Sequence, residues 1–176
     1  MIKIFDYELY SGYIMLNGKI VAYSLHNNID ILTKNLVKIA KFHNLNGDLI
    51  FDENLDKFFQ EKINKVLNNK ETFKLDLSKY RYKDIYEKIL EIPFGKTITY
   101  RELYNSLNKK YNMLQILNAI KNNPFIILIP CHRVIKENDI SGYTPLGPEF
   151  KRKLLEYEHN LIITWFFIKL NVKDFE

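Results

Sequence analysis

The first half of the chain shows two kinds of hydrophobic pattern, one typical of strands and one typical of helices. Asn17-Gly18 separates two apolar runs, and this dipeptide in that setting predicts a β-hairpin with a two-residue turn. Apolar residues recur at helical spacing in 31–42 and again in 55–67. Residues 72–77 are predicted to form another short strand. Together these patterns predict a small sheet accompanied by helices.

The second half is predicted to be mostly helical. Residues 82–91 carry apolar side chains along one side, as an amphipathic helix does. Thr99 can cap the next helix, and Glu102 three residues later completes a capping box. A turn and a second short helix, about 112–122, follow. Two short helices across a turn indicate a helix-turn-helix, although helix pairs also occur in many folds that do not bind DNA.

These elements predict an α/β fold: a small N-terminal sheet-plus-helix lobe followed by a mostly helical C-terminal lobe with a helix-turn-helix. The lobe boundary is expected around residues 78–82, which divides the chain into 1–79 and 80–160. Residues 161–176 are left as a C-terminal tail, and we expect this tail to pack against the first lobe.

The composition of the chain supports a folded core, and the distribution of its charges bears on which partners it can bind. Hydrophobic residues make up 47% of the chain and aromatic residues 14%. The net charge is +5, and residues 80–160 carry 13 Lys and Arg against 9 Asp and Glu. This basic bias is compatible with a nucleic-acid face, and equally with ordinary solvated lysines.

Several classes of protein are excluded by what the sequence lacks. A single cysteine excludes an internal disulfide and any multi-cysteine zinc site, and the four histidines show no paired ligand spacing. We therefore expect no metal and no organic cofactor. The first residues do not read as a signal peptide, and the apolar stretch 161–170 is shorter than the ~20 residues that span a bilayer. A soluble, cytoplasmic monomer with no membrane partner is expected.

The segment that carries chemistry surrounds the single cysteine. An apolar run, 125–129, leads to Cys131 between Pro130 and His132. A cysteine thiolate is a strong nucleophile, and a neighbouring histidine can lower the thiol pKa or accept its proton. In an extended segment adjacent side chains point in opposite directions, so a bridging water could replace direct contact between the two residues. The alternative interpretation is a buried structural cysteine beside a core histidine.

The pattern Asn-Pro-x-x-Ile-x-Ile-Pro-Cys-His-Arg-Val over residues 123–134 resembles the active-site signature of the O6-alkylguanine-DNA alkyltransferases, also called methylated-DNA–protein-cysteine methyltransferases. Its Pro-Cys-His-Arg-Val core is unusually specific for that family. Three more segments are similar to the family pattern: Phe94-Gly95 with Tyr100, Gly142-Tyr143-Thr144, and Leu154-Leu155 with Glu158. The resemblance covers about residues 80–160, which makes this the DNA-binding and active-site lobe, whereas the first 79 residues match only in architecture.

The resemblance implies DNA repair by direct, stoichiometric transfer of an alkyl group from O6-alkylguanine in double-stranded DNA to Cys131. O4-alkylthymine is a second candidate substrate. The damaged base would be flipped out of the duplex, and the thioether product would leave each molecule inactive after one transfer. The resemblance further implies that His132 acts as a base through a water. Glu158 would orient the imidazole and stabilise its protonated, charged form. Tyr100 donates a hydrogen bond to the leaving guanine, and Asn123 braces the active-site turn.

The resemblance also assigns residues that bind the substrate. Tyr143 and Thr144 would form the pocket wall and a donor to the guanine oxygen. The backbone carbonyls of Cys131 and Val134 would accept from the exocyclic amine. The prolines that follow Thr144 should stiffen this loop, which is richer in glycine in most family members. Arg133 is interpreted as a structural tie between C-terminal segments.

The predicted second DNA-binding helix departs from the family pattern. Leu114 stands where the family has an arginine that fills the gap left by the flipped base. An apolar wedge can also prop a base step open, but it offers the orphaned partner base no charge and no hydrogen bonds. Ala119 is the only small residue kept where DNA approaches closely, and Lys121 keeps a cation near the phosphates.

Three other functions remain as alternatives. The first is a protein that binds alkylated guanine lesions without efficient transfer, although relatives of that kind lack the cysteine that this chain has. The second is a cysteine hydrolase using Cys131 and His132, which would need an oxyanion hole that the sequence does not indicate. The third is a helix-turn-helix protein in which Cys131 is structural.

Overall fold

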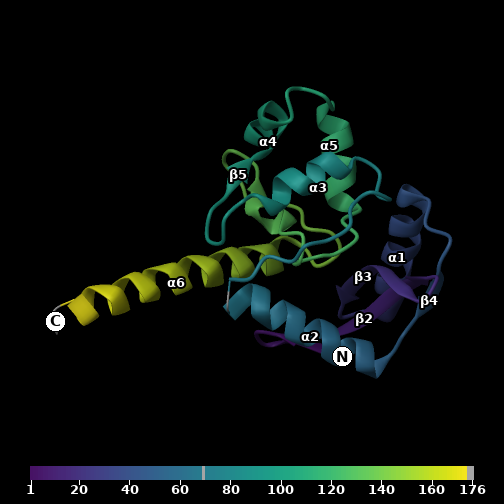
Figure 1. Ribbon diagram of the computed structural model, residues 1–176, viewed down its shortest axis with the longest axis horizontal. Helices are drawn as coiled ribbons and strands as arrows, with labels where there is room; N and C mark the ends of the chain where they lie inside the picture. Colours follow the sequence, from purple (N-terminus) through teal and green to yellow (C-terminus); the bar gives the residue numbers. More distant parts are fainter. Residues whose placement is uncertain (69, 174–176) are drawn as a thin grey trace.

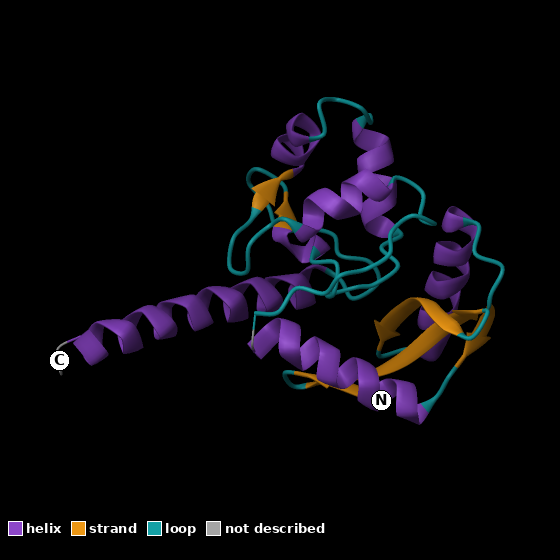
Figure 2. Cartoon of the chain, in the orientation of Figure 1, coloured by secondary structure: helices purple, strands orange, loops and turns teal. Residues whose placement is uncertain are grey.

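The computed structural model describes residues 1–68 and 70–173. The N-terminal part contains a four-stranded antiparallel sheet with two helices, and the second part is mostly helical (Figure 1). Figure 2 shows most of the strand structure gathered in the N-terminal part, with one short two-stranded sheet among the later helices. The α/β fold class predicted from the sequence is confirmed.

The predicted hairpin forms the centre of the main sheet. Strand β2 (Tyr7–Leu16) pairs with β3 (Lys19–His26) through a turn at Asn17 and Gly18. Both turn residues have positive φ, 51° and 72°, the conformation that favours Asn-Gly because an L side chain other than Asn or Asp rarely adopts it. Strands β1 (Ile2–Ile4) and β4 (Asp48–Ile50) pair with different stretches of β2.

Helices α1 (Ile29–His43) and α2 (Glu53–Asn68) accompany this sheet, as their apolar spacing predicted. Asn28 begins α1 by accepting hydrogen bonds from the backbone N–H groups of its first turn. The prediction of a strand at 72–77 is wrong: no strand in the described part of the chain pairs with it. Alternating side chains of this segment still pack on the core, which explains why its sequence reads as a strand.

The second part contains the predicted helix pair. Helices α3 (Lys83–Leu90), α4 (Tyr100–Ser106) and α5 (Met113–Lys121) pack together, and α4 and α5 are joined by a short turn. The capping box of Thr99 and Glu102 is present at the start of α4, and Asn112 with Gln115 forms another at the start of α5. Strands β5 (Ile98–Thr99) and β6 (Val134–Ile135) form the short second sheet.

The last element, α6 (Pro148–Lys173), was not predicted from the sequence. The residues after 160 were predicted to be a tail packed against the first lobe; instead 161–173 continue α6. Ile162 lies against Gly95 of the second part, and the C-terminal turns of the helix extend away from the rest of the chain in Figure 1. No glycine or proline occurs from 149 to 173 to end the helix. Residues 174–176 of the predicted tail lie outside the described residues. No helix in the described part of the chain is long and apolar enough to cross a membrane.

A continuous core joins the sheet to the loop that precedes the cysteine. Tyr23 of β3 is fully buried, and its backbone N–H donates to the carbonyl of Pro124 at 2.9 Å while its hydroxyl donates to that of Ile126. The hydroxyl of Tyr80 donates to the carbonyl of Val21. The loop 124–130 is therefore fixed from behind by the N-terminal part, although its residues lie about a hundred positions further along the chain.

Candidate active site

Cys131 opens a short 3-10 helix (Cys131–Arg133) and is 2% exposed. Asn123 holds the turn: its amide nitrogen donates to the carbonyl of Ile129 at 2.9 Å and to Cys131 Sγ at 3.0 Å, and its amide oxygen accepts from the backbone N–H of Phe125 at 2.9 Å. The extended geometry considered for Cys131 and His132 is wrong, because Pro130 leads directly into the helical turn. Ile127 adopts φ 72° in the same loop, a conformation that costs a β-branched residue ~1–3 kcal/mol.

The Cys131 thiol is buried, and the charge of Lys151 acts on it. Burial raises the pKa of this thiol, and the hydrogen bond from Asn123 and the charge of Lys151 oppose that rise. Lys151 is 1% exposed, and its ammonium group donates to the carbonyl of Val134 at 2.7 Å. It makes no ion pair with a carboxylate in the described part of the chain. Burial lowers the pKa of Lys151, and the charges of Cys131 and Asp139 oppose this effect. A Cys131 thiolate is thus one of two anions that this buried cation can stabilise.

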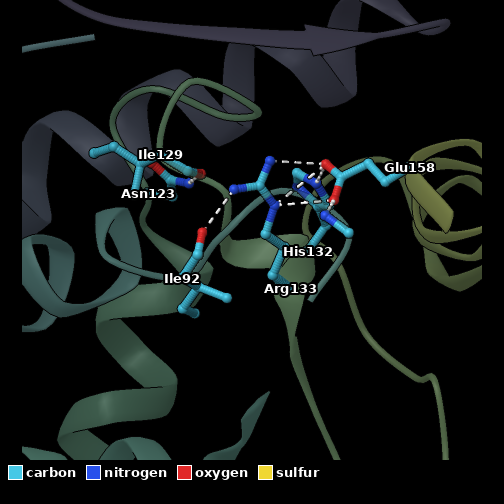
Figure 3. Close-up of polar contacts among 7 residues, drawn as sticks. Ile92, Asn123, Ile129, His132, Arg133 and Glu158 are labelled. Carbon is cyan, nitrogen blue, oxygen red and sulfur yellow. Dashed lines mark hydrogen bonds and ion pairs between the residues drawn. The ribbon is translucent and has the colours of Figure 1, made fainter. Parts of the chain in front are cut away.

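Three buried side chains form a charged network beside the cysteine (Figure 3). One Glu158 carboxylate oxygen lies 2.7 Å from His132 Nε2, and the Arg133 guanidinium donates to both oxygens at 3.0–3.2 Å. Arg133 Nη1, which does not contact Glu158, donates to the carbonyl of Ile92 at 2.8 Å. The backbone N–H of Gly95 donates to the Glu158 carboxylate at 3.0 Å. Arg133 thus links three segments, in line with its interpretation as a structural tie.

Electrostatics fix the protonation states in this network. Burial raises the pKa of the Glu158 carboxyl, but the hydrogen bonds and charges of His132 and Arg133 outweigh it and lower the pKa to about 2. Burial lowers the pKa of His132, with Glu158 opposing. A neutral His132 must therefore carry its proton on Nε2, because the ionised carboxylate can only accept. Its Nδ1 is then an acceptor, and this buried atom has no hydrogen-bond partner among the described residues.

Tyr100, Tyr143 and Thr144 are the remaining residues predicted to act at the active site. Tyr100 begins α4, and burial together with the nearby Cys131 raises the pKa of its hydroxyl, which stays protonated as a donor. The ring of Tyr143 meets that of His132 edge-on, with 6.1 Å between ring centres. The buried Tyr143 hydroxyl has no hydrogen-bond partner in the part of the chain that the structure describes. Thr144 lines a cavity of about 430 Å³ between the loop 142–148 and α1. No hydrogen bond in the described part of the chain joins His132 directly to the Cys131 sulfur.

Helix α5 presents only part of its predicted DNA-binding set to solvent. Leu114 is 66% exposed at the start of the helix, and Lys121 is exposed at its end. Ala119 is a correction: its side chain is fully buried, and its carbonyl accepts from the hydroxyl of Tyr86, so the side chain cannot contact DNA. The carbonyl of Val134, proposed to bind the exocyclic amine of guanine, already accepts from Lys151 at 2.7 Å.

Sequence reasoning missed Lys151. The signal was present in the spacing of α6, because Phe150, Leu154 and Glu158 lie on its buried side and Lys151 sits one turn before Leu154 and two turns before Glu158. Lysine side chains are mostly exposed, so Lys151 would ordinarily be assigned to the solvent face of the helix. In the described residues no group of three or more His, Cys, Asp or Glu side chains is placed to hold a metal ion.

The fold and site define a helix-turn-helix protein with a buried free cysteine beside a His–Glu–Arg network. Residues 81–160 match the model of the 6-O-methylguanine DNA methyltransferase, DNA binding domain. A methylated-DNA–protein-cysteine methyltransferase of Saccharolobus islandicus is 36% identical over 108 residues, 61% of this chain and 67% of the relative. The protein of the same name from Metallosphaera sedula is 33% identical over 108 residues, 61% of this chain and 65% of its own.

Solved structures agree with these relatives. The O6-methylguanine-DNA methyltransferase of Pyrococcus kodakaraensis superposes with a TM-score of 0.69 at 26% identity, covering 89% of this chain and 95% of that one. A Mycobacterium tuberculosis OGT, solved in complex with DNA, superposes with a TM-score of 0.50 at 28% identity, covering 60% and 68%. The chain belongs to the O6-methylguanine-DNA methyltransferase family.

Proposed function

We propose that this protein repairs DNA by moving the alkyl group of O6-alkylguanine onto Cys131 in a single, irreversible transfer. Membership of a family of methylated-DNA–protein-cysteine methyltransferases supports the reaction class. The observation that carries the assignment of residues is the buried Cys131 beside a neutral His132 whose Nδ1 is free and whose Nε2 is held by ionised Glu158. O4-alkylthymine is proposed as a second substrate because its alkyl group is bound to the same kind of oxygen.

The reaction begins with deprotonation of the thiol. A water between Cys131 and His132 passes the thiol proton to Nδ1, and Glu158 stabilises the imidazolium that results. Lys151 and the amide of Asn123 stabilise the thiolate. The thiolate then attacks the alkyl carbon from the side opposite the guanine oxygen. A sulfur–carbon bond forms as the oxygen–carbon bond breaks, and the electron pair of that bond passes into the guanine ring.

The negative charge that develops on the departing guanine must be stabilised. Tyr100 is proposed as the hydrogen-bond donor, because burial and the nearby cysteine raise the pKa of its hydroxyl and keep it protonated. The guanine then takes up one proton, which balances the proton that His132 received from the thiol. Thr144 is proposed as a donor to the guanine oxygen, and Tyr143 as the wall against which the base lies. The carbonyls of Cys131 and Val134 are proposed to accept from the exocyclic amine. The product is a thioether with no leaving group, so each molecule acts once.

Access to the cysteine requires two movements. A base inside a duplex cannot reach a thiol that is 2% exposed, so the damaged nucleotide must be flipped out, at a cost of a few kcal/mol. The loop 136–147 must also move, because Tyr143 is buried against the site. Leu114, exposed at the start of α5, is proposed as the apolar wedge that occupies the space left in the duplex, with Lys121 near the phosphates.

The deciding experiment measures the intact mass of the protein after mixing with a duplex that contains one O6-methylguanine. We expect one added methyl group per molecule, mapped to Cys131, with no further addition at excess substrate and none in the Cys131→Ser variant. If the duplex produces no adduct, free O6-benzylguanine distinguishes two causes. Labelling by the free base places the failure in DNA engagement, which favours a lesion-binding protein without efficient transfer. No labelling by either substrate overturns the proposed chemistry.

A further inference from the structure

The N-terminal part contains an apolar cavity that the transfer reaction does not use. It has a volume of about 570 Å³, within the range of small-molecule sites, and lies between α2, the tip of the β2–β3 hairpin and the segment 73–75. Phenylalanine, leucine and isoleucine side chains form most of its lining. Phe58 and Phe73 are the more exposed of its four phenylalanines, while Phe59 and Phe125 are buried. Phe58 is 50% exposed, so part of its ring is accessible to a ligand in the cavity.

The opening of the cavity is positively charged. Lys19, Lys62 and Lys74 all line it, and none of them forms an ion pair with a described residue. The Lys62 ammonium group lies 4.6 Å from the centre of the Phe58 ring and 4.5 Å from that of Phe73, so two aromatic faces hold it at the opening. Asp76 is close enough to interact with Lys19, but it does not line the cavity. No carboxylate lines this cavity.

We propose that this cavity binds a fatty acid, with the hydrocarbon chain against the phenylalanine rings and the carboxylate among the three lysines. An apolar interior with cations confined to the opening matches a molecule that has one anionic end and one long apolar end. A small hydrophilic anion would leave the rings exposed, and an uncharged hydrocarbon would leave the lysines without a partner.

The base of the cavity is the back of the active-site loop. Phe125 lines the cavity, its N–H donates to Asn123, and its carbonyl accepts from Ile129 N–H at 2.8 Å. Asn123 in turn donates to the Cys131 sulfur. A chain lying against Phe125 therefore contacts the segment that fixes the nucleophile, and we infer that occupancy of the cavity changes the rate of Cys131 alkylation. This second inference rests on the proposed function, whereas the binding site itself does not.

Titration calorimetry with octanoate, decanoate and dodecanoate, each below its micelle concentration, tests the binding site. We expect one molecule bound per chain and a Kd that falls by up to about fourfold per methylene, the effect of burying each group in an apolar site. Dodecyltrimethylammonium, with the same chain and the opposite charge, should bind at least about tenfold more weakly, because each lysine then repels it. Equal binding of the two probes, or no binding of dodecanoate, overturns the proposal.

Variants separate this site from non-specific charge effects. Lys62→Glu with Lys74→Glu should weaken dodecanoate binding at least about tenfold. Lys57→Glu with Lys65→Glu, which reverses two exposed charges of α2 outside the cavity, should leave it unchanged. Phe58→Ser should also weaken binding while leaving the fold intact, since this ring is half exposed. An equal loss of dodecanoate affinity in both double variants would show that net charge alone attracts the probe. That result would overturn the proposed binding site.

The inferred link to the active site is measured separately, as the rate of Cys131 labelling by free O6-benzylguanine with and without saturating dodecanoate. We expect a changed rate in the wild type and no change in the Lys62→Glu, Lys74→Glu variant. An unchanged rate despite measured binding overturns the link and leaves the binding site standing. Failure of the proposed repair function would instead appear as no labelling under any condition, while calorimetry would still report binding.

Discussion

At the scale of single residues, Glu158 is the side chain on which the site depends most, because one carboxylate accepts from His132, Arg133 and Gly95. Replacing it by glutamine removes the charge while keeping the shape. We expect Glu158→Gln to lower the free energy of unfolding by about 3–5 kcal/mol, since the buried Arg133 cation is left without a counter-ion. Labelling of Cys131 by O6-benzylguanine should also slow. Urea denaturation and labelling kinetics measure the two effects, with exposed Glu156→Gln on the same helix as the control.

The second prediction at this scale concerns Lys151. In Lys151→Met the cation that lowers the pKa of the Cys131 thiol is lost, while an apolar side chain of similar length fills the same space. We expect the profile of labelling rate against pH to move to higher pH. At neutral pH the reaction should slow about tenfold for each unit by which the pKa of the Cys131 thiol rises. An unchanged profile with a normal fold would show that Lys151 acts only by holding the Val134 carbonyl.

Part of the candidate site could be predicted from the sequence. Cys131, His132 and Asn123 come from one contiguous motif, and the hydrogen bonds of Asn123 are local in the chain. Lys151 and Ala119 were missed or misplaced for a different reason. Whether a helical side chain faces the core depends on what packs against that helix, and this information is spread over residues far away in the chain.

At the scale of elements, local chemistry decided which predictions succeeded. The Asn-Gly turn and the Thr99 capping box are specified by residues within a few positions of one another, and both are present. The segment 72–77 has an equally clear alternation of polar and apolar residues, but a strand also needs a partner, and none lies beside it among the described residues. Where α6 would end was not predicted either, because no residue marks its end.

Helix α5 carries the prediction that belongs to this scale. We expect Leu114→Arg to strengthen binding to duplex DNA and to increase the salt dependence of binding by about one counter-ion, because the new cation meets a phosphate or an unpaired base. Labelling by the free base should not change. Fluorescence anisotropy at several salt concentrations measures the effect. Met113→Arg, at the neighbouring exposed position, is the control, and an equal gain there would mean that any added charge suffices.

At the scale of the whole molecule, His43 joins the N-terminal part to the DNA-binding helices. It ends α1, its Nε2 lies 2.8 Å from the carbonyl of Asn122 after α5, and its Nδ1 accepts from the backbone N–H of Arg81. Burial lowers the pKa of His43 to about 4, with the Asn122 hydrogen bond opposing. The ring is therefore neutral in the folded protein at neutral pH, and it contributes nothing to the pH dependence of stability above its unfolded pKa of 6.5.

Between pH 6.5 and pH 4, His43 is protonated in the unfolded chain but stays neutral in the folded protein. We expect stability to fall across this range by up to about 3 kcal/mol from this residue, and its effect to level off below pH 4. His132, whose pKa is also lowered, adds to the same trend. Comparing urea midpoints of wild type and His43→Gln at several pH values isolates the contribution. A His43→Gln protein with the wild-type slope would contradict the assignment.

The position of Glu158 in α6 has a consequence for how the protein is made. Glu158 lies 26 residues after His132, so the ribosome releases the reactive cysteine before the carboxylate that completes its surroundings. A chain emerging in this order folds its N-terminal part first. Until α6 docks, the segment Cys131–Arg133 lacks the Lys151 and Glu158 side chains that α6 places beside it. Synthesis and docking of α6 thus set the moment at which these surroundings are complete in the nascent chain.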